Sequence, residues 1–183
     1  MKKLIIGLVG QVGAGKGTAA DMLRDKHGAE TFTFSAILTD ILNRLFLDNS
    51  RDHLIKISMA LREAFGQDVL SNTMEKQVAN ASVEIIAVDG IRRMDDIKDL
   101  SQVSGFHLIE ITAPAEVRFE RLKNRNEKIG EGNMTWEEFI EISKRETERT
   151  IAGVAEQAEL HIDNSGSMAE LEQKLQDMIT KFS

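Results

Sequence analysis

The segment GQVGAGKGT at residues 10–18 is the part of the sequence whose residue types and spacing point most directly to chemistry. Its glycines permit backbone amides to turn inward and approach the oxygen atoms of a phosphate group closely. Lys16 can reach the outer phosphates of a nucleotide, and a helix that begins near Lys16 adds its positive dipole end. The alternative is a glycine-rich strand-to-helix turn without a ligand. We expect a phosphate-binding loop, with the ligands Gly10, Gly13, Ala14, Gly15, Lys16, Gly17 and Thr18.

A second cluster of charged residues follows the apolar run at residues 83–88. The run ends at Asp89, and Gly90, Arg92 and Arg93 come next. An acidic residue that ends a buried strand beside a phosphate loop can hold the water shell of Mg²⁺. The alternative role for Asp89 is to cap the next helix, and the two roles are compatible.

Further arginines recur at intervals of four residues in the second half of the chain. Arg121 and Arg125 form one pair, and Arg145 and Arg149 form another. Residues four apart share a face of a helix, so the two arginines of each pair should lie on the same side of their helix. The alternative is a solvated helix face, on which the arginines pair with the glutamates Glu120, Glu141 and Glu148.

The elements that must position these residues alternate along the chain. Strand-like apolar runs occur at residues 4–9, 31–34, 83–88, 106–111 and 160–162. Helical patterns separate them, at residues 18–25, 36–46, 53–65, 68–81, from 114 onward, 136–150 and 168–182. This alternation predicts a parallel sheet with crossover helices on both faces. We therefore expect one domain over residues 1–183, an α/β three-layer sandwich of about five parallel strands.

The predicted strands also place the candidate residues relative to one another. Gly10, Ser35 and Asp89 each follow directly after a strand-like run. Ligands of open parallel sheets bind at the carboxyl ends of the strands, so these residues should meet at one edge of the sheet.

Composition and charge argue against several other classes of function. The net charge of -7 argues against broad binding of nucleic acids or of anionic membranes, so local cations must hold any anionic ligand. The chain has no cysteine, which suits a reducing cytoplasm and excludes disulfides and thiolate metal sites. No apolar stretch reaches the roughly 20 residues that span a bilayer. We expect a cytoplasmic protein whose partner is a small molecule, with no nucleic acid and no membrane.

Several motifs occur in the order found in nucleoside monophosphate kinases. Residues 10–18 resemble the G-x-P-G-x-G-K-G-T loop of adenylate kinase and its relatives, with Val12 at the position of the proline. Residues 89–93 resemble their D-G-F-P-R segment, and residues 121–125 their R-x-x-x-R segment. Residues 161–167 resemble their final strand and loop. The resemblance extends to dephospho-coenzyme A kinases, is greatest to divergent adenylate kinase-related proteins, and implies a P-loop NTPase fold.

The resemblance implies roles on the side of the phosphate donor. Lys16 and Arg125 would contact phosphate, and Arg145 would close over the transferring phosphoryl group. Arg121 would stack on the donor base, and Asn164 would lie in the loop near that base. The candidate catalytic residues are Lys16, Arg93, Arg125 and Arg145.

The resemblance also bears on the metal and on the lid. Ser or Thr usually follows the loop lysine directly and contacts Mg²⁺, but here Gly17 precedes Thr18. The G-K-G-T form implies that Mg²⁺ is held mainly through water and phosphate oxygens, with Asp89 as the protein group behind the water. A short lid is implied at about residues 126–142.

On the acceptor side the resemblance is looser. Arg93 takes the place of the arginine that binds the acceptor phosphate, and Arg92 replaces a proline. Ser35 begins the corresponding acceptor helix, which starts an insertion at about residues 36–81, but the arginine of the S-T-G-D-x-x-R motif is missing. Arg44 or Arg62 could substitute for it. The candidate acceptor ligands are therefore Ser35, Arg44, Arg62, Arg92 and Arg93.

The expected reaction is transfer of the γ-phosphoryl group of ATP, or GTP, to a (deoxy)nucleoside monophosphate. The acceptor phosphate is already ionised at neutral pH, so positioning and charge neutralisation suffice. A kinase of dephospho-coenzyme A or of another small molecule is the alternative, although a ribose hydroxyl benefits from a carboxylate base and the nearest acid is Asp40. A non-kinase NTPase or a nucleotide-binding regulator is the alternative from a different class.

Overall fold

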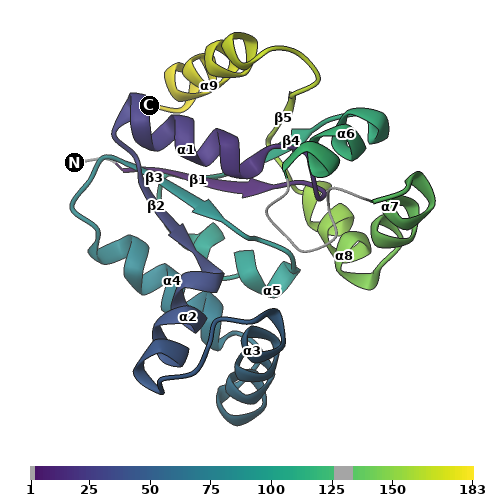
Figure 1. Ribbon diagram of the computed structural model, residues 1–183. Helices are drawn as coiled ribbons and strands as arrows, with labels where there is room; N and C mark the ends of the chain where they lie inside the picture. The colour runs from purple at the N-terminus through teal and green to yellow at the C-terminus, as the bar shows by residue number, and fades with distance from the viewer. Residues whose placement is uncertain (1–2, 126–133) are drawn as a thin grey trace.

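A parallel sheet forms the centre of the computed structural model, which describes residues 3–125 and 134–183 (Figure 1). Within these residues, five strands pair in the order β2-β3-β1-β4-β5, and every pairing is parallel. The five strands that the sequence predicts are confirmed. They are β1 (Leu4–Val9), β2 (Glu30–Thr33), β3 (Ile85–Asp89), β4 (Phe106–Thr112) and β5 (Leu160–Asp163).

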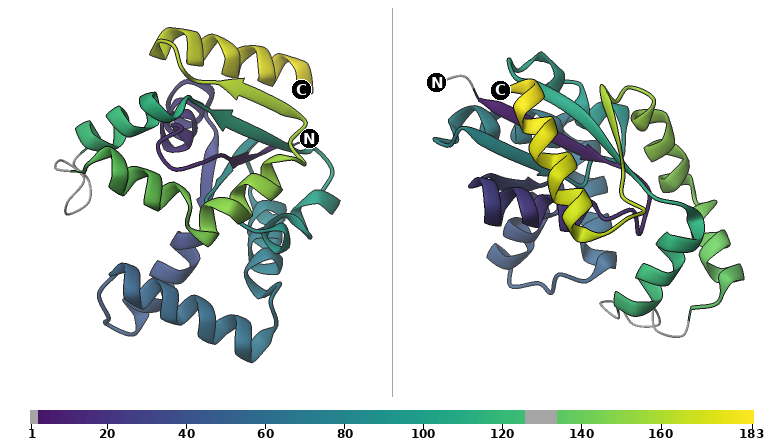
Figure 2. Two further views of the ribbon diagram at one scale, coloured as in Figure 1. Left: turned by 90° about the vertical axis from the view of Figure 1, so that its right-hand side faces the viewer. Right: turned by 90° about the horizontal axis from the view of Figure 1, so that it is seen from above.

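Helices connect the strands and cover both faces of the sheet (Figures 1 and 2), as the three-layer prediction requires. Among the described residues, no helix has the length and apolar character needed to cross a membrane. The helices are α1 (Lys16–His27), α2 (Phe34–Arg44), α3 (Arg51–Phe65), α4 (Val69–Asn80), α5 (Met94–Ile97), the 3-10 helix η1 (Leu100–Gln102), α6 (Ala115–Arg125), α7 (Trp136–Ser143), α8 (Glu146–Ala155) and α9 (Met168–Phe182).

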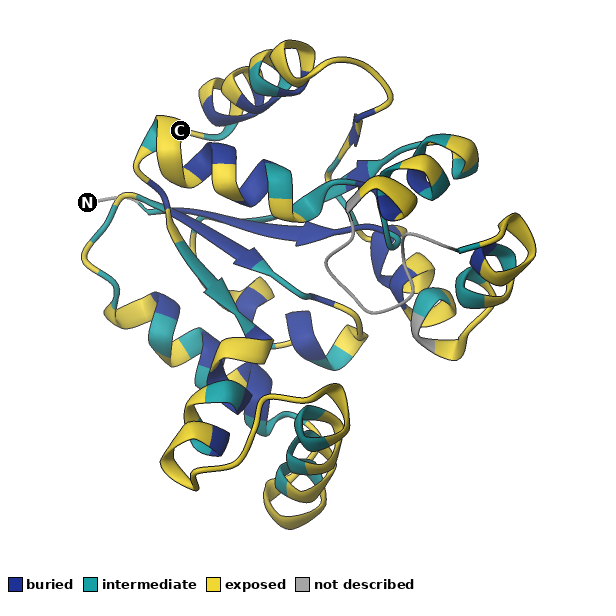
Figure 3. Ribbon diagram, viewed as in Figure 1, coloured by how far each residue is buried: buried dark blue, intermediate teal, exposed yellow. Residues whose placement is uncertain are grey.

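The central strand β1 is buried along its whole length, as its continuous apolar run predicts (Figure 3). Leu4, Ile6 and Leu8 point to one face, where they pack in a core shared with α1 and α9. Ile5 and Val9 point to the other face, where the core includes residues of α2, α4 and α8. The loop that follows β1 is therefore attached to the best protected strand of the sheet.

Most predicted boundaries shift by one or two residues, and one predicted helix differs from the structure. The strand expected at residues 31–34 ends at Thr33, because the Thr33 hydroxyl accepts the Ala36 amide at 3.0 Å and caps α2. The single helix expected at residues 136–150 is wrong, since Arg145 has a non-helical backbone, with a ψ of 149°, and separates α7 from α8. The break lets Phe139 of α7 and Ile151 of α8 become buried against different parts of the molecule.

The segment between β2 and β3 consists of the three helices α2, α3 and α4. Its middle helix, α3, packs on α2 and α4 and contains no buried residue. This segment coincides with the insertion predicted at about residues 36–81, and its role in acceptor binding stays a prediction.

Candidate nucleotide-binding site

The loop between β1 and α1 has the backbone conformation that its glycines predict. The Ala14 amide donates to the Gln11 carbonyl at 3.1 Å, and Gly13 has a φ of 80°. This bond across four residues, with a left-handed glycine at the third, is typical of a type II turn. Val12 occupies the second position of that turn, and Gly15 is the N-cap of α1. Lys16, Gly17 and Thr18 then form the first turn of α1, at the carboxyl end of β1.

Lys16 folds back over the loop. Its ammonium group donates to the carbonyl oxygen of Gly10 at 2.6 Å and to that of Gln11 at 3.3 Å. The positive charge thus lies above the glycine loop and beside the N-terminus of α1, where the helix dipole also favours an anion.

Asn164 and Arg121, both predicted on the donor side, form hydrogen bonds to the backbone of the loop. The Asn164 side chain is buried and donates to the Ala14 carbonyl at 2.8 Å. Arg121 donates to the same carbonyl at 3.3 Å and to the Asn164 carbonyl at 2.7 Å. The structure therefore brings both residues to the loop, through hydrogen bonds that hold its backbone. Stacking of Arg121 on a donor base stays a prediction.

Two residues that the sequence analysis gave no role in the site hold the Val12 peptide. The Glu148 carboxylate of α8 accepts the Val12 amide at 3.0 Å, and the Arg118 guanidinium of α6 donates to the Val12 carbonyl at 3.2 Å. Arg118 is 6% exposed and lies over the Phe139 ring, 5.3 Å from its centroid. Burial lowers the pKa of the Arg118 guanidinium, and the nearby carboxylates of Glu148 and Glu116 act in the opposite direction.

The end of β3 lies beside the phosphate loop, because β3 and β1 are paired neighbours. Asp89 ends β3, and one of its carboxylate oxygens accepts the Gly90 amide at 2.7 Å. Asp96, not Asp89, caps the start of α5: its carboxylate accepts the amides of Arg92 and Arg93, each at 3.0 Å. Asp96 therefore takes the capping role considered for Asp89, and the role of Asp89 in holding hydrated Mg²⁺ stays a prediction.

The predicted acceptor arginines fall into two groups. Arg92 and Arg93 are exposed directly after β3. Arg62 of α3 is instead engaged in the protein: its guanidinium lies 3.4 Å from the buried Asp96 carboxylate and donates to the Gln67 carbonyl at 2.6 Å. Arg62 thus ties α3 to the turn that carries Arg92 and Arg93. This makes a direct acceptor contact by Arg62 less favourable, because a charge partner would have to be given up.

No described contact joins the remaining candidates to one another. Ser35 is exposed in the first turn of α2, and its hydroxyl lies 3.1 Å from that of Thr33. Arg44 is exposed in the last turn of α2, and Arg145 is exposed at the start of α8. The Arg125 side chain and residues 126–133 of the predicted lid lie outside the described residues. Trp136, at the start of α7, contacts the Phe119 ring edge-on at a centroid distance of 5.3 Å.

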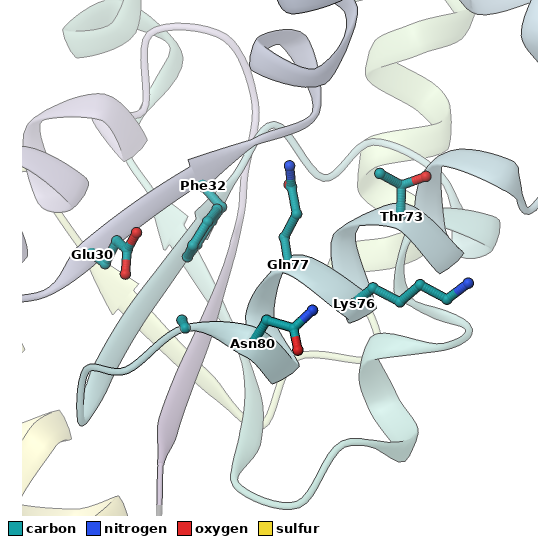
Figure 4. A pocket seen from close by; sticks show the side chains of 7 residues that line it. Glu30, Phe32, Thr73, Lys76, Gln77 and Asn80 are labelled. Atoms are coloured by element: carbon teal, nitrogen blue, oxygen red, sulfur yellow. The ribbon is translucent and has the colours of Figure 1, made fainter.

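A hollow of about 450 Å³ lies elsewhere, between the edge strand β2 and α4 (Figure 4). Glu30 and Phe32 line it from β2, and Lys76, Gln77 and Asn80 line it from α4. Because Glu30 is the first residue of β2, this hollow is displaced toward the amino end of the sheet, away from the phosphate loop.

A glycine loop with a lysine, placed between the central strand of a parallel sheet and a helix, defines a P-loop kinase-like protein. A family model described as an AAA domain matches residues 9–139, well over half of the chain. The chain belongs to this family. The predicted superfamily and fold are thereby confirmed.

Proteins of several organisms are similar to this chain. A UPF0200 protein of Sulfurisphaera tokodaii is 25% identical over 178 residues, which are 97% of each chain. A shikimate kinase structure from Bacteroides thetaiotaomicron has a TM-score of 0.65 at 15% identity, over 97% of this chain and 98% of that one. A shikimate kinase from Acinetobacter baumannii in complex with shikimate has a TM-score of 0.55 at 19% identity, over 98% and 94%. The structural likenesses show the fold.

Proposed function

We propose that this protein transfers the γ-phosphoryl group of ATP, or GTP, to a (deoxy)nucleoside monophosphate. The observation that carries the proposal is the pairing of β1 with β3, which sets the glycine loop and Lys16 beside Asp89 and the exposed Arg92 and Arg93. The glycine loop with Lys16 suits a donor triphosphate, and Arg92 and Arg93 suit an acceptor phosphate. A plain NTPase would need only the first of these groups.

The residues divide the work of phosphoryl transfer in this proposal. The loop amides and Lys16 hold the donor phosphates, while Arg93 holds the acceptor phosphate in line with them. Arg145, at the start of α8, neutralises charge on the transferring group. Mg²⁺, held through water by Asp89 and directly by phosphate oxygens, would supply further charge neutralisation when bound. An ionised phosphate attacks without a general base, so the proposal requires no carboxylate next to the acceptor.

An acceptor panel tests the proposal directly. ADP formation from ATP and Mg²⁺ is measured with each nucleoside monophosphate and deoxynucleoside monophosphate, with dephospho-coenzyme A and with shikimate, and products are identified by mass. The proposal expects stimulation by a nucleoside monophosphate. Stimulation only by a hydroxyl acceptor would favour the alternative kinase, and acceptor-independent ATP consumption would favour a plain NTPase.

Arg93→Ala should impair use of the acceptor more than use of ATP. Removal of one charged contact to a phosphate should raise the KM for the acceptor by roughly tenfold to a hundredfold, because such contacts contribute about 1.5–3 kcal/mol. The measurement is the KM for each substrate at saturating concentrations of the other. Arg24→Ala is a control, since Arg24 is exposed on α1 and pairs with Asp21 and Asp25. Unchanged acceptor kinetics would make Arg93 an ordinary surface charge.

Asp89→Asn should raise the Mg²⁺ concentration needed for half-maximal activity by about tenfold, because one carboxylate behind the metal's water shell is lost. The amide oxygen of asparagine can still accept the Gly90 N–H, so the turn after β3 should be preserved. A magnesium titration of the initial rate measures the effect, with Asp25→Asn on α1 as the control. Superimposable titrations of variant and wild type would remove Asp89 from the metal site.

A further inference from the structure

The Val12 peptide is held on both sides by residues from the distant helices α6 and α8. Its N–H donates to Glu148 at 3.0 Å, and its carbonyl accepts from Arg118 at 3.2 Å. Both partners are more than 100 residues away in the sequence and are partly or fully buried. Each of these hydrogen bonds has one charged partner, which strengthens it, so the two together can fix the loop relative to both helices.

The residue type at position 12 makes the Glu148 contact possible. Val12 occupies the second position of the Gln11–Ala14 turn, where proline is favoured and where a proline has no N–H to donate. Valine supplies this N–H, and Glu148 accepts it inside a partly buried site. A valine at this position has an N–H that a proline would lack. Without Glu148, this N–H at the base of the phosphate loop would need another hydrogen-bond acceptor.

We propose that Glu148 is a positioning residue that couples α8 to the phosphate loop through the Val12 amide. Glu148 lies in the first turn of α8, three residues after Arg145 and one before Arg149. Its bond to Val12 therefore fixes the end of α8 that carries both arginines at the loop that holds the donor phosphates. This inference rests on the proposed function, in which Arg145 acts on the transferring phosphoryl group. The Glu148–Val12 hydrogen bond would hold α8 and its arginines in position relative to the phosphate donor.

A purely structural role for Glu148 would be to balance the buried Arg118 charge. The two roles separate because Val12→Pro removes the N–H donor and leaves both charges in place. The turn should accept proline, since Gly13 keeps its left-handed φ of 80° and the second position of a type II turn suits proline. Loss of function in Val12→Pro would then come from the missing bond and not from an unbalanced charge.

Steady-state kinetics of Val12→Pro, Glu148→Ala and the double variant test the coupling. We expect kcat to fall about tenfold in each single variant, which is the loss expected for one charge-assisted hydrogen bond, and the KM for ATP to change by less than about threefold. The double variant should be about as active as the single variants, because both substitutions remove the same bond. Glu148→Gln should recover most of kcat, since its amide oxygen can accept the same N–H.

The matched control is Glu146→Ala, which removes an exposed acid from the same turn of α8 and should leave kcat within about twofold of wild type. If the losses of the two single variants multiply in the double variant, or if Glu146→Ala loses as much activity, the proposed coupling is wrong. Unfolding curves of each variant identify any loss that comes from stability alone.

Amide hydrogen exchange keeps the test independent of the proposed function. In protein without an acceptor, Val12→Pro should accelerate exchange in residues 146–155, although no residue of α8 has been changed. Exchange in α8 that matches wild type would overturn the coupling even if the enzyme is an active kinase. Faster exchange in a protein that phosphorylates no acceptor would support the coupling and remove the proposed function.

Discussion

Replacing Lys16 by alanine is expected to reduce phosphoryl transfer by roughly a thousandfold or more, because the variant loses a charge that neutralises the transferring phosphates. The ammonium group lies over the loop carbonyls of Gly10 and Gln11, at 2.6 and 3.3 Å, and not in the hydrophobic core. We therefore expect a folded variant whose defect is functional. The measurements are the rate of ADP formation with the best acceptor and ATP affinity by calorimetry.

Lys26→Ala is the matched control for this experiment. Lys26 lies in the last turn of α1, at the end of the helix that is farther from the loop. It is exposed and pairs with Glu172 of α9. Its loss should leave phosphoryl transfer near the wild-type rate. Near-normal turnover of the Lys16 variant, with Lys26→Ala behaving likewise, would refute the assignment of the loop to the phosphate donor.

Gly10→Ala should destabilise the protein by about 2–3 kcal/mol and weaken ATP binding at the same time. Gly10 has a φ of 148°, and a Cβ atom there would collide with the backbone carbonyl of Ile111 in β4. Ile111 is fully buried in the central core, so its backbone cannot move aside cheaply. Urea unfolding gives the change in the free energy of unfolding, and calorimetry gives the change in affinity.

The chain offers a control glycine for the stability measurement. Gly153 lies within α8, and a Cβ atom there would meet nothing within 4 Å. Gly153→Ala should therefore leave the protein as stable or increase its stability by about 0.5–1 kcal/mol, since alanine is the better helix former. Equal stabilities for Gly10→Ala and wild type would mean that the loop does not pack against β4 as described.

Most of the donor side of the site could be predicted from the sequence. A phosphate loop is built by its own backbone, so residues 10–18 carry almost all the information that fixes its conformation. The continuous apolar runs predicted the strands, because a strand that is buried on both faces does not alternate between apolar and polar residues. The break between α7 and α8 was missed because residues 136–150 contain neither proline nor glycine, and the packing of Phe139 and Ile151 decides it.

The supports of the loop could not be predicted, because they depend on which distant residues the fold brings together. Arg118 and Glu148 reach Val12 from helices more than 100 residues away, and Asp96 took the capping role that the sequence left open for Asp89. Even so, one signal was visible. Valine at the position of a turn proline introduces a donor that a folded protein must satisfy.

The helix α3 differs from the rest of the molecule in a way that bears on protein engineering. None of its 15 residues is buried, whereas every residue of β1 is. Leu54, Ile57 and Leu61 pack against the core from this helix, but its exposed positions should tolerate mutation with little loss of folding free energy. Libraries that randomise its exposed positions while sparing Arg62 could therefore search for new phosphate acceptors on a scaffold that stays intact.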